Sequence, residues 1–280
     1  MRYSGFHRLT RRVHREHREY WQVHLGSEIE ADRLCALRAT FRQRGWDPPS
    51  FTAMVVKAIS LALRETSAIY PELNCIVTGC LGWRTIHTFE RVSAGVAVAR
   101  EMNGADTVSL AVIEDPEQLP LAGITKRLSD FATKPAHEVP ELRNCERLVR
   151  TPWPLQSLLL WLGHRVPALR RRYRGTFILT TVGKFDVDWQ LTLPQGATLQ
   201  FGFGVIRDRA VVRHGQVVPA KTFNLTMSFD RRVLNGRQCA VLLKSIRQIL
   251  TEARFEDWPA TEAPQPQPMR LNPAPTAIPA

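Results

Sequence analysis

The sequence predicts an α/β fold, in which helices pack on a mixed β-sheet within one domain over residues 1–258. Helical and strand-like stretches alternate along the chain, and several neighbouring strands have the spacing of hairpins. The chain of 280 residues is long enough to bury a substantial core, and its 44% hydrophobic and 23% charged residues are typical of a globular protein. No stretch reaches the roughly 18 consecutive apolar residues that a membrane-spanning helix needs.

The first predicted elements are a basic helix at residues 5–20 and a strand at 22–29. Asp32 then has the position of an N-cap, and apolar residues at helical spacing follow it until Gly45. We therefore expect a second helix that begins at Asp32 and ends before Gly45.

A buried helix and a set of strands follow. Ser50 is a second N-cap, and residues 51–64 are apolar on most sides, so this helix should lie inside the domain. The next predicted elements are a hairpin at 75–77 and 83–89, strands at 92–99 and 107–113, and a helix at 121–132.

Residues 140–174 depart from this pattern, and we interpret them as a basic amphipathic insertion. The stretch is rich in proline and arginine, and one helical face would carry four leucines, Leu155, Leu158, Leu159 and Leu162. Such a helix can pack against a neighbouring subunit, cover a channel, or lie on an anionic membrane. We expect packing within an assembly, and peripheral membrane contact through 153–174 is the alternative.

The C-terminal part returns to alternating elements, with strands predicted at 176–181, 198–206, 210–214 and 222–229 and a helix at 237–254. His214 precedes Gly215 in a predicted hairpin turn, so it should be exposed. Residues 259–280 contain seven prolines and no apolar periodicity, which predicts a disordered tail.

The net charge of +12 points to an acidic ligand, a nucleic acid or an anionic membrane, or else to a solvated basic surface. No helix-turn-helix, zinc finger or aromatic-basic sheet motif supports nucleic-acid binding, so we expect no nucleic-acid partner.

Five cysteines stand at positions 35, 75, 80, 145 and 239, without a Cys-x-x-Cys pair and without histidines at ligand spacing. We therefore expect no metal, and reduced thiols in a cytoplasmic protein are the simplest account. The N-terminus lacks the apolar core of a signal peptide, which also favours the cytoplasm.

Three stretches resemble motifs of a known family. Gly175-Thr-Phe-Ile-Leu-Thr-Thr-Val-Gly-Lys-Phe is similar to Gly-Thr-Phe-Thr-Ile-Ser-Asn-Leu-Gly-Met-Phe, and Phe203-Gly-Val-Ile is similar to Val-Gly-Ala-Ile. Asn224-Leu-Thr-Met-Ser-Phe-Asp-Arg-Arg-Val-Leu-Asn-Gly resembles the signature Leu-Ser-Phe-Asp-His-Arg-Val-Val-Asp-Gly. Over roughly residues 5–135 and 175–255 the chain therefore resembles the catalytic domain of the dihydrolipoamide acyltransferases of 2-oxoacid dehydrogenase complexes.

The resemblance implies a chloramphenicol-acetyltransferase-like, two-layer α/β domain that forms a homotrimer, with each active site in a channel between neighbouring subunits. Coenzyme A or an acyl-coenzyme A would enter from one end, and the acyl acceptor from the other. Family members carry lipoyl domains before the catalytic domain. Because this chain begins almost at the catalytic domain, a lipoyl group is expected on another protein, a lipoyl carrier or a dehydrogenase-complex partner.

The resemblance also assigns residues to the site. The hydroxyl that serves the oxyanion corresponds to Thr180, the residue that helps to fix the site to Asn235, and the catalytic histidine to Arg231. A guanidinium cannot accept a proton at neutral pH. It can lower the pKa of a nearby thiol by about 1–3 units, so an active form would favour thiol acceptors.

His24, in the first strand, is an alternative base, although a partly buried histidine with a structural hydrogen bond is the more ordinary interpretation. Two functions stay open: a coenzyme A-dependent acyltransferase with an altered active site, and a catalytically inactive trimeric scaffold or regulatory subunit. Open space around Thr180 and Arg231 would favour the enzyme, and a channel filled by bulky side chains would favour the scaffold.

Overall fold

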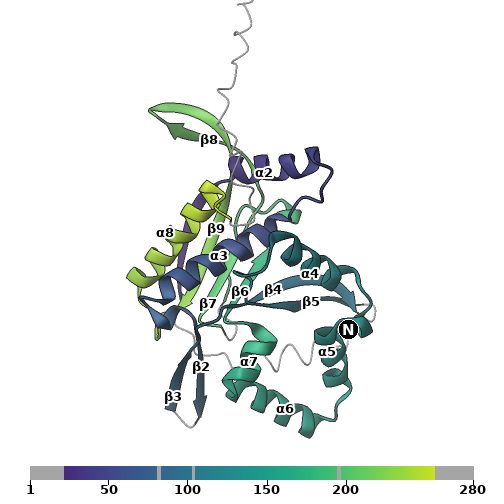
Figure 1. Ribbon diagram of the computed structural model, residues 1–280. Helices are drawn as coiled ribbons and strands as arrows, with labels where there is room; N and C mark the ends of the chain where they lie inside the picture. Colours follow the sequence, from purple (N-terminus) through teal and green to yellow (C-terminus); the bar gives the residue numbers. More distant parts are fainter. Residues whose placement is uncertain (1–21, 81–82, 103–104, 194–196, 256–280) are drawn as a thin grey trace, which may run out of the picture.

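The computed structural model describes residues 22–80, 83–102, 105–193 and 197–255. In this part of the chain a seven-stranded sheet has the order β1-β9-β7-β6-β4-β5, with β8 paired to β9 (Figure 1). Its strands are β1 (Gln22–Glu30), β4 (Ser93–Met102), β5 (Ala105–Glu114), β6 (Phe177–Thr181), β7 (Leu199–Phe203), β8 (Arg207–Arg213) and β9 (Gln216–Asp230). β6 runs parallel to both β4 and β7 while the other pairs are antiparallel, so the predicted mixed sheet is confirmed.

One face of the sheet is covered by helices. α3 (Phe51–Ser67) and α8 (Gly236–Glu252) pack against each other, with α2 (Asp32–Gln43) and α4 (Leu121–Thr133) beside them (Figure 1). The strands contribute alternate residues to this layer, and Phe177, Phe201 and Met227 are fully buried in the same apolar core as the helices. The two-layer arrangement follows from this division of the sheet into an apolar and a polar face.

The remaining elements lie at the edges. The short helix at Pro71–Leu73 leads into the two-stranded hairpin of β2 (Cys75–Cys80) and β3 (Trp83–Thr88). The predicted insertion forms three helices beside β4 and β5, preceded by a short turn of helix at Ala136–Glu138. They are α5 (Pro140–Arg150), α6 (Trp153–Arg165) and α7 (Pro167–Arg174), and each has a proline at its first or second position, where a missing N–H costs nothing.

The predictions of a helix cap and of a hairpin turn, which depend only on neighbouring residues, were confirmed. The Ser50 side chain accepts a hydrogen bond from the Ala53 amide at 3.1 Å and so caps α3 as expected. His214 is exposed at positive φ in the turn between β8 and β9, also as expected. The strands on either side were predicted too short, because β9 continues from Gln216 to Asp230 without a break.

The prediction that Asp32 caps α2 is wrong. Ala31 has the N-cap position, and Asp32 is the first helical residue. One oxygen of the Asp32 carboxylate accepts a hydrogen bond from the Lys221 amide at 2.9 Å, and the other binds Arg213 at 2.8 Å. A contact with β8 and β9 thus replaces the local capping bond. The predicted helix at 5–20 and the tail at 259–280 lie outside the described residues.

Candidate active site

The sheet face opposite the helices carries buried polar side chains. Gln200, Thr226, Ser228 and Asp230 alternate with the core residues of β7 and β9 and therefore point to this second face. Buried polar groups need partners, and the Thr226 hydroxyl donates to the carbonyl oxygen of Gln190 at 2.6 Å. The polar face is thus closed in its centre by the chain segment that contains Gln190.

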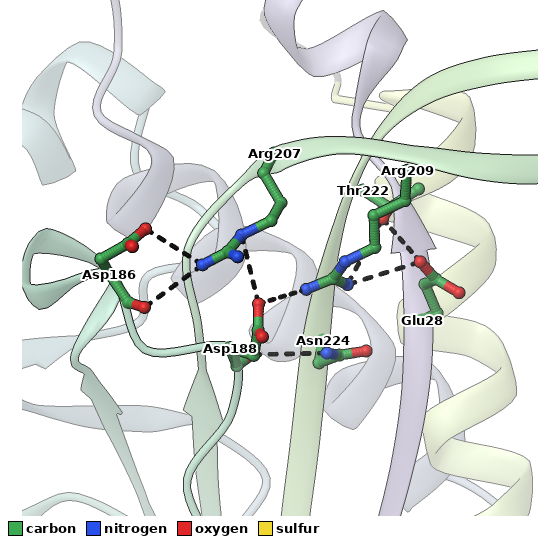
Figure 2. A network of polar contacts seen from close by, with 7 residues as sticks. All are labelled: Glu28, Asp186, Asp188, Arg207, Arg209, Thr222 and Asn224. Atoms are coloured by element: carbon green, nitrogen blue, oxygen red, sulfur yellow. Dashed lines mark hydrogen bonds and ion pairs between the residues drawn. The ribbon is translucent and has the colours of Figure 1, made fainter.

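This covering segment, residues 186–193, is held by charged groups. The Arg209 guanidinium on β8 binds the Asp188 carboxylate at 2.6 Å, and Arg207 binds the Asp186 carboxylate at 3.0 Å. Figure 2 shows that Arg209 also reaches Glu28 on β1, so three parts of the chain share one network. The network fixes the start of the covering segment against the sheet.

The position of the covering segment also explains why a glycine stands at position 204, within one of the family motifs. A Cβ atom at Gly204 would lie 1.9 Å from the carbonyl oxygen of Asp188, so any other residue would push the segment away. This segment and the residue before it also expose apolar side chains, of which Leu191 and Leu193 line the cavity described next. The exposed apolar residues are Phe185, Val187, Trp189, Leu191 and Leu193.

Thr180 lies at the end of β6 and lines a cavity of about 1040 Å³. The sheet contributes residues such as Leu110 and Ile178 to the cavity wall, and the three insertion helices contribute the opposite wall. The surface of the cavity is mostly apolar, although about half of the lining residues are polar or charged. A threonine hydroxyl at the edge of such a cavity could donate a hydrogen bond to an oxyanion.

Arg231 lies in the turn that follows β9, and its neighbours define the shape of that turn. The amides of Val233 and Leu234 donate to the carbonyl oxygen of Asp230 at 3.1 and 3.0 Å. The Asp230 carboxylate, which is only 3% exposed, accepts hydrogen bonds from Nε and Nη2 of Arg232 at 2.9 and 2.7 Å. Arg232 is therefore the ion-pair partner of the buried Asp230 carboxylate. The Arg231 side chain is exposed and makes no ion pair with a described residue.

Asn235 has a structural role at the start of α8. Its side chain accepts a hydrogen bond from the Gln238 amide at 3.0 Å, and the Gln238 side chain accepts one from the Asn235 amide at 3.0 Å. This reciprocal pair is a capping box, which satisfies two amides that the helix cannot. The position of Asn235 is thus fixed from the helix that follows it.

The structure does not bring Thr180 and Arg231 together within one chain. Thr180 is in register with Gly202 on β7, which in turn is in register with Thr226 on β9. Arg231 lies five positions beyond Thr226, a separation of about 16 Å along the strand at roughly 3.3 Å per residue. Arg231 is accordingly absent from the lining of the Thr180 cavity. Within one chain the two candidate residues therefore lie in separate places.

His24 lies on β1 opposite Ser228, and its Nδ1 atom is 2.7 Å from the Ser228 hydroxyl. The Thr192 hydroxyl donates to the same Ser228 oxygen at 3.4 Å. Thr192 lines the cavity and His24 does not. His24 is thus connected to the cavity only through two hydroxyl groups.

Two cavity residues were missed by the sequence interpretation. His164 on α6 lines the cavity, and burial, followed by the charges of Arg174 and Arg170, lowers its pKa to about 4, so the ring is neutral at pH 7. In the sequence the only hint was a histidine eight residues after Gln156 in a largely apolar stretch, and this spacing does not by itself mark a cavity residue. Cys145 also lines the cavity, but burial raises the pKa of its thiol, which makes it a poor nucleophile.

Other kinds of site are absent from the part of the chain that the structure describes. No three His, Cys, Asp or Glu side chains there gather in a way that could hold a metal ion. No helix in the same residues combines the length and apolar character needed to cross a membrane.

The sequence matches the family model for the acyltransferase catalytic domain of 2-oxoacid dehydrogenases over residues 6–140 and 172–255. The lipoamide acyltransferase component of the branched-chain alpha-keto acid dehydrogenase complex of Bacillus subtilis is 26% identical over 204 residues, 72% of this chain and 39% of that protein. The acetyltransferase component of the pyruvate dehydrogenase complex of the same organism is 23% identical over 239 residues, 83% of this chain and 45% of that protein. The chain thus spans less than half the length of these relatives.

Solved structures agree on the fold. A probable dihydrolipoamide acetyltransferase from Listeria monocytogenes superposes with a TM-score of 0.66 at 17% identity, covering 92% of this chain and 96% of that one. The dihydrolipoamide acetyltransferase of Azotobacter vinelandii, studied for the catalytic role of a serine, a histidine and an asparagine, gives a TM-score of 0.60 at 16% identity, covering 88% and 87%. With the family match over most of its length, this chain belongs to the family of 2-oxoacid dehydrogenase acyltransferases, through their catalytic domain.

Proposed function

We propose that this protein transfers acyl groups between coenzyme A and a thiol acceptor, at a site assembled from the Thr180 half of one chain and the Arg231 half of another. The open cavity beside Thr180 carries the proposal, because a scaffold without substrate has no need of one. The insertion helices line this cavity without filling it, and its volume is about 1040 Å³. This favours the enzyme over the inactive scaffold.

Acyl exchange requires an acceptor thiolate, which attacks the thioester carbonyl and forms a new C–S bond. The tetrahedral intermediate then expels the coenzyme A thiolate, which takes up a proton from solvent. Thr180 would donate a hydrogen bond to the oxyanion. Arg231 would lower the pKa of the acceptor thiol by its charge without removing the proton, which then passes to water. An alcohol acceptor would gain little, since its proton is far less acidic.

A free thiol has a pKa of about 8.5 and is only a few per cent ionised at pH 7. Beside Arg231 a larger fraction should be ionised, and without a general base the wild-type rate should follow that fraction and rise with pH up to the lowered thiol pKa. The natural acceptor would be a dihydrolipoyl group, by analogy with the relatives. Calorimetric titration with coenzyme A and acetyl-coenzyme A, followed by assays of acetyl transfer to dihydrolipoamide, tests the proposal. Absence of binding to either ligand would leave the scaffold as the better account.

The half-sites require an assembly, and we propose a homotrimer as in the family. The exposed apolar side chains of Phe185, Val187 and Trp189, at and just before the start of the covering segment, support this, since apolar patches commonly mark subunit contacts. Analytical ultracentrifugation should give three times the chain mass at micromolar concentration. A monomer would remove the basis for a shared site.

A second surface favours peripheral contact with an anionic membrane. The exposed side of α6 is apolar: Gln156 is 7% exposed and donates to the carbonyl oxygen of Leu148 at 2.9 Å, whereas Leu158 is 56% exposed. The other exposed apolar residues of the helix are Trp153, Leu155, Leu159, Trp161 and Leu162. From residue 147 to residue 185 the sequence has no Asp or Glu and eight basic residues, Arg147, Arg150, Arg165, Arg170, Arg171, Arg172, Arg174 and Lys184. An apolar face with leucine and tryptophan beside such basic residues is typical of an interfacial helix.

Co-sedimentation with vesicles tests this contact. The protein should pellet with phosphatidylglycerol-containing vesicles but not with neutral phosphatidylcholine vesicles, and high salt should weaken the binding. Leu158→Asn with Leu162→Asn should abolish it, whereas Ile69→Asn, an equally exposed apolar position outside the insertion, should not. Equal recovery in the supernatant with both lipids would contradict the proposal, and a change of oligomeric state in the double variant would assign α6 to a subunit contact.

A further inference from the structure

The insertion gives the Thr180 cavity a wall that the family pattern does not include. The family match stops at residue 140 and resumes at 172, so residues 141–171 lie outside it. Within this stretch, α5, α6 and α7 place Leu148, Leu160 and Leu169 on the cavity. The family part supplies the hydroxyl and the insertion supplies the opposite surface.

This wall is apolar and faces an apolar part of the sheet. Val108, Leu110 and Ile178 line the cavity from β5 and β6, across from the leucines of the insertion. Small-molecule sites in proteins are commonly about 300–1,000 Å³, with mostly apolar linings and a few polar groups that fix orientation. A cavity of about 1040 Å³ is thus large for an acetyl group and suited to a longer hydrocarbon chain.

Several polar groups near the insertion wall have partners elsewhere or carry no charge, while Arg147 and Arg174 line the cavity as charged groups. Nη1 of Arg170, which is 8% exposed, donates to the carbonyl oxygen of Val77 at 2.5 Å, and Glu141 forms an ion pair with Arg127. The His164 ring is buried and neutral, so it adds no charge to the wall at pH 7. Between the insertion and the sheet, a hydrocarbon chain would therefore meet mainly side-chain carbon.

We propose that the α5–α7 insertion makes this protein selective for acyl thioesters whose acyl part is an apolar hydrocarbon chain, with the thioester carbonyl at Thr180 and the chain between the insertion and the sheet. The proposal rests on the acyl-transfer function above and specifies its substrate class. The alternative, an acyl group ending in a carboxylate that pairs with an arginine of the cavity, is separated from it by the experiment.

Gly163 offers a way to fill the cavity without disturbing the fold. It lines the cavity from α6, and a Cβ atom added there meets no heavy atom within 4 Å. Both alanine and leucine are better helix formers than glycine, so Gly163→Ala and Gly163→Leu should fold at least as well as the wild type. The two variants form a size series that reduces the free space in steps.

The experiment compares the affinities of octanoyl-, acetyl- and succinyl-coenzyme A by calorimetry. The wild type should bind octanoyl-coenzyme A roughly tenfold or more tighter than acetyl-coenzyme A, because each buried methylene adds affinity. Gly163→Leu should remove most of this preference because it weakens octanoyl-coenzyme A binding far more than acetyl-coenzyme A binding, and Gly163→Ala should reduce the preference partially. Equal octanoyl and acetyl affinities, a succinyl preference, or no effect of Gly163→Leu would overturn the proposal.

Titration with a dansyl-labelled fatty acid separates the cavity from the reaction. If no coenzyme A thioester binds, the acyl-transfer function fails. Binding of the labelled fatty acid to the wild type but not to Gly163→Leu would then still support a hydrocarbon site beside the insertion. Failure of the labelled fatty acid to bind, or unchanged binding by the variant, would overturn the hydrocarbon site itself.

Discussion

The Thr180 and Arg231 half-sites differ in what determines their shape. Thr180 stands at the edge of an open cavity, one wall of which comes from helices outside the family match. Arg231 stands in a turn held by the Asp230–Arg232 pair and by the cap of Asn235, while its own side chain is exposed. The shape of the turn therefore does not depend on the residue at position 231. A single substitution at position 231 can therefore change the chemistry of this half-site. The Thr180 half-site differs from the family pattern through a whole segment, the α5–α7 insertion.

The largest expected effect follows from that independence of the turn. Arg231→His should fold normally and raise acetyl transfer from acetyl-coenzyme A to dihydrolipoamide by about 10- to 1,000-fold, since it restores a general base. Arg231→Gln, which removes the charge without adding a base, should show no gain. A folded Arg231→His variant that binds coenzyme A and remains inert would show that the site has lost more than its base.

The Asp230–Arg232 pair should dominate the stability of the turn. Asp230→Asn leaves the Arg232 guanidinium without its buried carboxylate and should lower the free energy of unfolding by about 3 kcal/mol, measured by urea denaturation. Asp208→Asn removes the exposed pair with Lys221 and should cost less than about 1 kcal/mol. Similar losses for the two variants would mean that the Arg231 turn is held by something other than this pair.

Acid should lower the stability of the protein through His164, which lines the cavity. Its pKa falls from 6.5 in the unfolded chain to about 4 in the folded protein, so the folded state binds fewer protons below pH 6.5. Stability is therefore retained above pH 6.5 and lost as the pH falls toward 4, by about 2 kcal/mol for this group. Urea denaturation at pH 7 and pH 4.5 should show a smaller loss for His164→Gln than for the wild type. An equal loss would place the ring in a more solvated position.

The smallest effect concerns the cap of α8. Asn235→Ala removes one half of the capping box and should lower the free energy of unfolding by about 1 kcal/mol. Asn235→Asp keeps an oxygen that can accept from the Gln238 amide and should be nearly neutral. If Asn235→Ala is as stable as the wild type in urea, the position of the turn is not supported from the α8 side.

Sequence patterns predicted the parts of this molecule that depend on neighbouring residues. The Ser50 cap and the turn at His214 and Gly215 were correct because each is settled within a few residues. The mixed sheet followed from the alternation of helical and strand-like stretches, and the family motifs gave the positions of Thr180 and Arg231. Asp32 was assigned wrongly because its carboxylate binds Lys221 and Arg213, which lie far along the chain.

The cavity could not be predicted in the same way. The leucines of α6 were correctly placed on one helical face, but periodicity does not state which face the domain covers. In the structure Leu158 and Leu162 are exposed, whereas Leu159, Leu160 and His164 line the cavity. The buried Gln156 is bonded to the Leu148 carbonyl. The separation of Thr180 from Arg231 also required the strand register, since their distance in sequence says nothing about which strands lie between them.

We propose that two chains share the reaction site. A mixed assembly of two different chains tests this sharing most directly. One chain would carry Arg231→His together with Thr180→Ala, so that it has the base but not the hydroxyl. The other would be the wild type, with the hydroxyl but not the base. The two would be co-expressed with different tags and purified through both tags in turn. Removal of an oxyanion donor costs about 10²–10³ in rate, so each assembly alone should transfer acetyl groups slowly.

In a mixed trimer one of the three interfaces joins the base of one chain to Thr180 of its neighbour. The mixed assembly should therefore exceed either parent by about a third of the gain expected for Arg231→His, roughly 3- to 300-fold. Activity equal to the average of the two parents, in an assembly shown by both tags to be mixed, would contradict a shared site.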